Sequence, residues 1–199
     1  MTSRSLLVLA VVIALSALFI GCAKPPQAEL DAAQAALDAA KAAEANRYVA
    51  DIYNAAQDSL NAATAEIEAQ NGKFALTRNY KKAAALLAAA TQLANESAEK
   101  VAERKEEVKA EAEKLMVDVQ TALKDAKKLL RKAPRGKEGR AAVEAMQSEL
   151  KAVEAAVAEV PAVIESGDYM AARNTLNANL QKVNSIIDEV KQAIAKTRR

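Results

Sequence analysis

Histidine and tryptophan are absent from the 199 residues, and cysteine occurs once, as Cys22. A chain without histidine has no Ser-His-Asp triad, no phosphotransfer imidazole and no imidazole-ligated metal site. Carboxylates are plentiful, but they are spread along the sequence as they would be on the solvated faces of helices. We therefore expect no enzyme activity, no metal and no cofactor.

Aromatic residues and glycine are also scarce, at 3% aromatics and five glycines, although 51% of the residues are hydrophobic. Much of this hydrophobic fraction is alanine, which is the best helix former and a poor filler of volume. The composition predicts long helices packed at close range; together with the apolar stripes and the repeat described below, it predicts an all-α fold of elongated, antiparallel helical hairpins with coiled-coil-like packing.

The longest apolar run, from Leu6 to Ile20, follows Arg4 and ends at Gly21 and Cys22. A positive start, a short apolar core and a small residue before the cut are typical of a secretory signal. A membrane-spanning helix requires about 20 apolar residues, which is more than this run offers. The pattern favours a cleaved signal peptide over an uncleaved anchor.

The end of this run resembles the signal of bacterial lipoproteins. The residues that carry the resemblance are Leu18, Phe19, Ile20, Gly21 and Cys22. It implies that the Cys22 thiol takes a diacylglycerol, that cleavage leaves Cys22 first, and that no thiol remains for catalysis or metal binding. Ala23, where an aspartate would retain the protein, resembles the signal for transport to the outer membrane. A cleaved signal without lipid is the alternative.

Helical patterns fill the rest of the chain. One pattern runs from about Ala28 to Ala69, with a shift near Asn46, and Asn71-Gly72 ends it. Its apolar stripe comprises Leu30, Ala33, Leu37, Ala40, Tyr53, Ala56, Leu60, Ala63 and Ile67. A second helix starts around Asn79, whose side chain can cap it, and meets no proline or glycine for about 54 residues, until Pro134.

The centre of this second helix, from Glu96 to Lys114, mixes acids and bases with sparse apolar positions, which predicts a solvated stretch. Acid–base pairs at helical spacing support an exposed helix there. They are Glu96–Lys100, Glu106–Lys109 and Glu111–Lys114.

Two more helices are predicted beyond the break at Pro134 and Gly136. The third runs from about Arg140 to Glu165, with Pro161 expected to kink it or end it early, and the fourth runs to about Lys196. Their stripes are Val143, Leu150, Val153, Val157 and Val160, then Leu176, Leu180, Val183, Ile186, Ile187 and Val190.

The two halves resemble each other. Ala55, Gln57, Leu60, Ala62 and Ala65 match Ala145, Gln147, Leu150, Ala152 and Ala155, and Tyr80, Ala83, Leu87 and Ala89 match Tyr169, Ala172, Leu176 and Ala178. We expect a signal peptide over 1–21, a lipid-anchored spacer over 22–27, an N-terminal hairpin over 28–114 and a C-terminal bundle over 115–199, sharing one long helix.

Tyr80 and Tyr169 each open the returning helix of a hairpin. The first interpretation is that each ring closes the hairpin tip over small residues, with its hydroxyl in water. The alternative is an aromatic pair that stacks on a sugar or a partner.

Basic residues gather before and after the break at Pro134, between two acidic stretches. Those singled out for partner binding are Lys124, Lys128, Arg131, Lys132 and Arg135. One interpretation is that they solvate a turn and face acidic helices; the other is a docking patch for an acidic partner, an anionic glycan or anionic headgroups. A net charge of +2 gives no reason to expect nucleic acid as a partner.

The mature part of the chain is similar to the bacterial envelope family known as domain of unknown function 4398. The similarity covers about Pro25 to Glu113 and lies in Pro25-Pro26, in Ala28-Glu29-Leu30 and in Tyr48 to Tyr53 before a helix that ends at Gly72. It implies a helical periplasmic module, with no known catalytic residues to carry over to this chain. We expect a lipid-anchored scaffold or spacer, or alternatively a module that binds peptidoglycan or an envelope protein through the basic turn. Alanine stripes also allow self-association.

Overall fold

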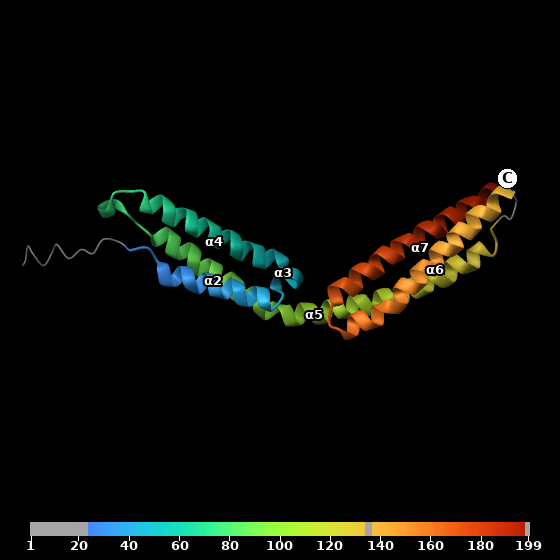
Figure 1. Ribbon diagram of the computed structural model, residues 1–199, viewed down its shortest axis with the longest axis horizontal. Coiled ribbons are helices and arrows are strands. Elements are labelled where there is room, and N and C mark those ends of the chain that lie inside the picture. The colour runs from blue at the N-terminus through green and yellow to red at the C-terminus, as the bar shows by residue number, and fades with distance from the viewer. Residues whose placement is uncertain (1–23, 134–136, 198–199) are drawn as a thin grey trace, which may run out of the picture. The chain divides into compact units, whose positions relative to one another are not determined.

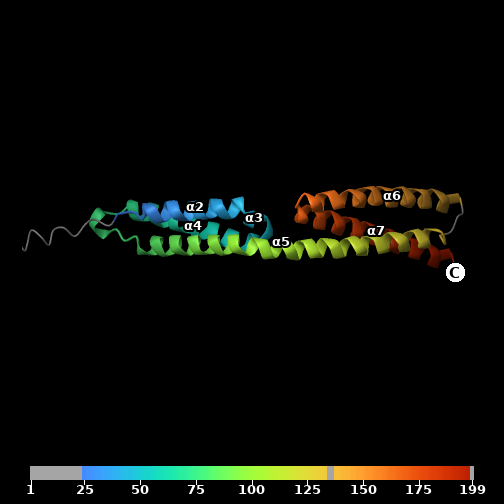
Figure 2. The same ribbon diagram turned by 90° about the horizontal axis from the view of Figure 1, so that it is seen from below.

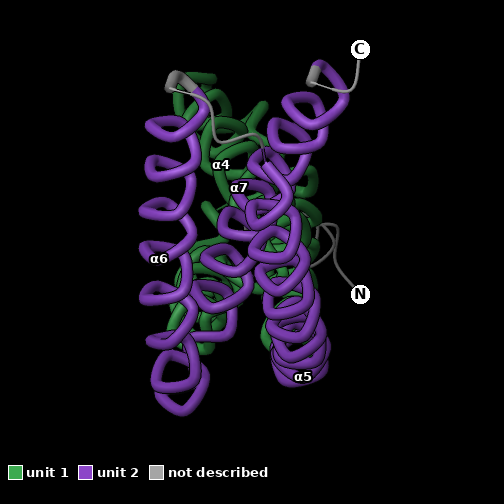
Figure 3. Tube along the Cα trace, turned by 90° about the vertical axis from the view of Figure 1, so that its right-hand side faces the viewer, with its two compact units in different colours: residues 1–100 green, residues 101–199 purple. Residues whose placement is uncertain are grey.

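The computed structural model describes residues 24–133 and 137–197, and it is all-α across them, as the composition predicts. Two compact units divide between Lys100 and Val101, within the longest helix (Figure 3). The helices are α2 (Gln27–Ala42), α3 (Ala45–Tyr48), α4 (Ala50–Asn71), α5 (Lys81–Leu130), α6 (Lys137–Glu165) and α7 (Tyr169–Thr197), with the 3₁₀ turn η1 (Ala75–Thr77) (Figure 1).

Unit 1 is a bundle of α2, α4 and the first part of α5, which lie side by side in Figures 1 and 2. Small residues dominate the core, so the helix axes can approach closely. The buried residues include Ala33, Leu37, Ala40, Tyr53, Ala56, Leu60, Ala63, Ile67, Ala83, Leu87, Ala90 and Ala94. All but Leu30 of the stripe predicted for residues 28–69 is therefore buried.

The prediction of one helix over 28–69 is wrong, because α2 ends at Ala42 and the chain folds back as α4. The reversal is made by Glu44, whose φ of 69° lies in the left-handed region that glycine usually supplies. Its carbonyl oxygen accepts the N–H groups of Arg47 at 2.9 Å and Tyr48 at 3.1 Å. The break is hidden because a glutamate occupies the position where a glycine would have marked it.

Unit 2 is a bundle of the second part of α5 with α6 and α7. The stripes predicted for the last two helices are confirmed, with Val143, Leu180 and Ile187 partly buried and the other members fully in the core. Buried there are Leu150, Val153, Val157, Val160, Leu176, Val183, Ile186 and Val190. The early end suggested by Pro161 does not occur: α6 continues to Glu165, because Val160, Val163 and Ile164 pack against this core.

Helix α5 is 50 residues long and begins as predicted, with Asn79 Oδ1 accepting the Lys81 N–H at 3.0 Å. The stretch 96–114, predicted to be solvated, carries a narrow buried stripe. Ser97, Val101, Val108 and Ala112 are buried, and the Ser97 hydroxyl donates to the Ala94 carbonyl at 2.7 Å. Apolar residues spaced by four and seven along a charged helix suffice for such a stripe.

The leucines matched between the halves are buried in both units. Leu60 and Leu150 are buried on α4 and α6, and Leu87 and Leu176 are fully buried on α5 and α7. Each unit thus places the matched leucines in its own core.

Replacing Glu44 with glycine should leave the free energy of unfolding unchanged or raise it by up to about 1 kcal/mol, because glycine adopts a positive φ without strain. Replacing the neighbouring Ala43, whose φ is −76°, with glycine should instead lower the free energy of unfolding by about 0.5–1 kcal/mol. Urea denaturation followed by circular dichroism measures both. Equal losses in the two variants would contradict the turn at Glu44.

Candidate functional site

The residues proposed for lipid attachment and signal recognition lie outside the described residues. Leu18, Phe19, Ile20, Gly21 and Cys22 fall within 1–23. The described chain opens with Lys24, and the Pro25 and Pro26 carbonyls accept the N–H groups of Gln27 at 2.9 Å and Leu30 at 3.0 Å. The two prolines therefore lead directly into the first turn of α2, where a missing N–H costs nothing.

The predicted basic cluster lies at the end of α5. Lys124, Lys128 and Arg131 are exposed, and their spacing of four and three residues places them on one face. Lys132 is exposed in the turn that follows, while Arg135 lies in 134–136, outside the described residues. The structure thus brings together three of the five proposed residues on one face, with a fourth beside them.

The turn after α5 is held by its apolar residues and by backbone hydrogen bonds. Leu130 and Ala133 are buried, and the Lys132 N–H donates to the Leu129 carbonyl at 2.8 Å. Basic side chains near a helix C-terminus also offset the partial negative charge of its carbonyl groups. The backbone that carries the basic cluster is therefore held in place.

Only part of the basic stretch faces acidic helices, as the first interpretation expects. The Lys127 ammonium pairs with Glu154 of α6, and Lys127, Arg131 and Glu154 border a hollow of about 230 Å³ between α5 and α6. Lys124, Lys128, Arg131 and Lys132 make no ion pair with a residue that the structure describes. Their charge is available to a partner.

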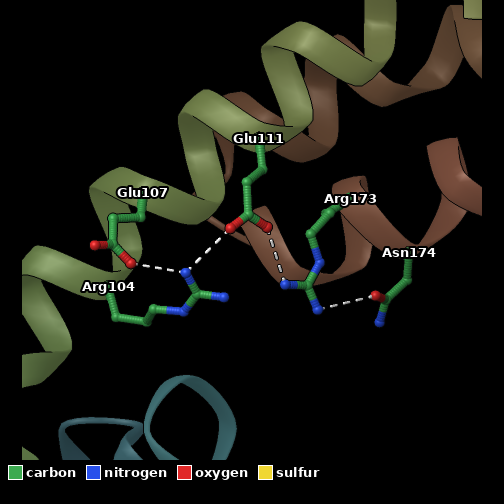
Figure 4. Close-up of polar contacts among 5 residues, drawn as sticks. All are labelled: Arg104, Glu107, Glu111, Arg173 and Asn174. Atoms are coloured by element: carbon green, nitrogen blue, oxygen red, sulfur yellow. Dashed lines mark hydrogen bonds and ion pairs between the residues drawn. The ribbon is translucent and has the colours of Figure 1, made fainter. Parts of the chain in front are cut away.

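A second polar cluster, which sequence reasoning missed, centres on Glu111 of α5 (Figure 4). Its carboxylate accepts from Arg104 Nη1 at 3.0 Å and from Arg173 Nη1 of α7 at 3.1 Å. Arg104 also pairs with Glu107 at 2.7 Å. The predicted partner of Glu111 was Lys114, but arginines at other positions take its two oxygens.

The cluster ties the first turns of α7 to α5. Arg173 reaches across 62 residues of sequence, and its Nη2 also donates to Asn174 at 3.4 Å. Partial burial raises the pKa of Glu111, but the hydrogen bonds from Arg173 and Arg104 outweigh this and leave that pKa lowered. The hydrogen bond to Glu107 is the main reason that the pKa of Arg104 is raised. These groups stay charged and stabilise unit 2.

The two tyrosines differ from each other, and the prediction of a hydroxyl in water is wrong for Tyr80. Tyr80 is buried, and its hydroxyl donates to Asn71 Oδ1 at 2.6 Å, so the hydroxyl is not left in water. Tyr169 is half-buried, and Lys109 Nζ lies 5.9 Å from its ring centroid, within the range of a cation–π contact.

Across the part of the chain that the structure describes, no cluster of acidic, histidine or cysteine residues could hold a metal ion. Within those same residues, no helix has the length and apolarity to cross a membrane. No protein-family model, curated protein or solved structure matches the chain.

Replacing Glu111 with glutamine should lower the free energy of unfolding at pH 7 by about 0.5–1 kcal/mol, since the cluster is partly exposed. Because the pKa of Glu111 is lower in the folded state, its ionised carboxylate stabilises the folded protein at pH values above the unfolded pKa of about 4.3. This stabilisation is lost as the pH falls through the folded pKa. Urea denaturation should show a larger difference from the wild type at pH 7 than at pH 3. Glu113→Gln, on an exposed neighbour, is the control; an equal loss in it would contradict the cluster.

Proposed function

We propose that this protein is a non-enzymatic scaffold or spacer of the bacterial cell envelope. A lipid on Cys22 holds it in the outer membrane on the periplasmic side, and the helical units present surfaces to other envelope components. The lipoprotein-like signal supports the location in the cell envelope, and the all-α fold of the described residues supports a helical module.

The observation that carries the mechanical part of the proposal is the sharing of α5. Leu87 of α5 is fully buried in unit 1, and Ala112 and Val119 of the same helix are fully buried in the core of unit 2. A helix of 50 residues has a contour length of about 75 Å. Helix α5 runs from Lys81 to Leu130, and it therefore contributes buried residues to the cores of both units.

A second function, the recognition of peptidoglycan or an envelope protein, is favoured by the basic cluster at the end of α5. Lys128 and Arg131 are exposed on one face and unpaired with any described residue, over a turn fixed by Leu130. Such a cluster attracts anionic groups through charge-assisted hydrogen bonds.

Cys22→Ser should abolish incorporation of labelled palmitate and release the protein from the outer-membrane fraction, because the acylated thiol is lost. Metabolic labelling with cell fractionation measures both effects, and Ser16→Ala, within the apolar run, serves as the control. Equal labelling of the wild type and Cys22→Ser would contradict lipidation at this residue.

The double variant K128E/R131E should lose the cross-links to a dominant envelope protein or glycan fragment if the basic cluster binds it. In-cell cross-linking with mass spectrometry measures this, and K114E/K196E makes the same change in net charge elsewhere. Links only between copies of the chain, unchanged by K128E/R131E, would contradict the binding module and favour the scaffold.

A further inference from the structure

The connection between α4 and α5 exposes two large apolar side chains. In the loop of residues 72–80, Phe74 is 73% exposed and Leu76 is 77% exposed. Among the described residues, the only other exposed large hydrophobic side chain is Val117, at 61%. Two such residues in one short loop form an apolar tip on the end of unit 1.

This tip is held by a network of polar contacts behind it. Arg78 donates from Nε to the Lys73 carbonyl at 3.0 Å and from Nη2 to the Asn71 carbonyl at 2.9 Å. The Asn71 side chain accepts the Tyr80 hydroxyl at 2.6 Å. The Thr77 N–H and hydroxyl both donate to the Phe74 carbonyl, at 2.9 Å and 2.8 Å. The backbone on both sides of Phe74 and Leu76 is therefore fixed while their side chains stay in solvent.

Gln70, near the end of α4, connects the two ends of the loop by a hydrogen bond to Asn79. It is buried, its Oε1 accepts the Asn79 N–H at 3.1 Å, and its Nε2 donates to Glu66 at 2.7 Å. Its hydrogen bond is the main reason that the pKa of Glu66 is lowered. A polar side chain in the core thus serves to join the last turn of α4 to the start of α5.

The tip lies at the same end of unit 1 as the entry of the chain into α2. Lys24, Pro26 and Glu29 line one hollow together with Leu76, Arg78 and Lys81. Cys22 precedes Lys24 by two residues, a span of at most about 7 Å. A lipid on Cys22 would therefore bring this end of unit 1 to the membrane surface.

The charges around the tip are mostly positive. Lys24, Lys73 and Lys81 are exposed, whereas Lys82 is paired with Glu66 at 2.9 Å. Glu29 is the acid on the rim of the hollow. Exposed phenylalanine and leucine next to lysines are the chemistry that binds an anionic bilayer surface, because the apolar groups enter the interface and the lysines meet the headgroups.

We propose that the tip of residues 72–80 docks on the membrane that carries the lipid anchor, with Phe74 and Leu76 in the headgroup–acyl boundary. Lys24, Lys73 and Lys81 face anionic phospholipid headgroups. The choice of membrane rests on the proposed lipidation of Cys22, whereas the insertion itself rests on the tip. A lipid on Cys22 tethers the chain at one point only, so a second contact at the tip strengthens attachment and fixes which end of unit 1 faces the bilayer.

The absence of tryptophan from the chain makes the test direct, because Phe74→Trp introduces a single tryptophan at the tip. The full-length variant is purified from bacterial membranes and reconstituted into vesicles of phosphatidylglycerol and phosphatidylethanolamine. We expect a blue shift of tryptophan emission and quenching by lipids brominated on their acyl chains. Both should shrink on phosphatidylcholine vesicles.

Val117→Trp is the matched control, because it places a tryptophan at the exposed apolar position of α5 in unit 2. Its emission should stay that of a solvated indole on the same vesicles. Equal shifts at positions 74 and 117, or no shift at 74, would overturn the proposal. Adding K73E and K81E to Phe74→Trp should reduce the quenching on anionic vesicles severalfold, and unchanged quenching would overturn the role of the lysines.

Mass spectrometry of the same Phe74→Trp preparation separates this proposal from the lipid anchor. Insertion of the indole at position 74 in a chain without lipid on Cys22 would leave the tip standing and overturn the anchor. Lipid on Cys22 with a solvated indole at position 74 would overturn the tip and leave the anchor standing.

Discussion

Close packing of small residues along α5 is the constraint on which both units depend. Its fully buried alanines lie seven and four residues apart in unit 1, with the buried Leu87 between the first two, and they recur in unit 2 among larger aliphatic residues. They are Ala83, Ala90, Ala94, Ala112 and Ala126. An alanine contributes little apolar area, so stability is spread over many contacts rather than concentrated in a few large side chains. Any residue larger than alanine at these positions would force the helices apart.

The helical stripes could be predicted from the sequence because helices with one buried face repeat their apolar residues every three or four positions. The reversal at Glu44 could not, because the stripe continues on both sides of it and no glycine or proline marks the turn. The spacing of apolar residues indicates which face of a helix is buried. It does not indicate whether the helix continues or the chain reverses direction. Only the left-handed conformation of one glutamate separates a hairpin from a long helix.

One candidate site could be predicted from the sequence, and the other could not. The basic cluster was predictable because its members are neighbours in sequence, and α5 places them on one face. The bond between Glu111 and Arg173 was not, because it joins residues 62 positions apart and no local spacing encodes it. Phe74 and Leu76 did carry a signal: they are large apolar residues in a connection where polar ones are usual. The sequence alone does not show whether such residues are buried by the rest of the chain; the structure shows that both side chains are exposed.

Each unit draws its helices from one uninterrupted stretch of sequence, with the division inside α5. Contacts between neighbouring helices close short loops, and bundles of low contact order fold in microseconds to milliseconds. A chain that emerges from a ribosome at about 5–20 residues per second therefore completes unit 1 before much of unit 2 has appeared. The first bundle then presents the start of α5 as a preformed helix, on which the second bundle grows in the direction of synthesis.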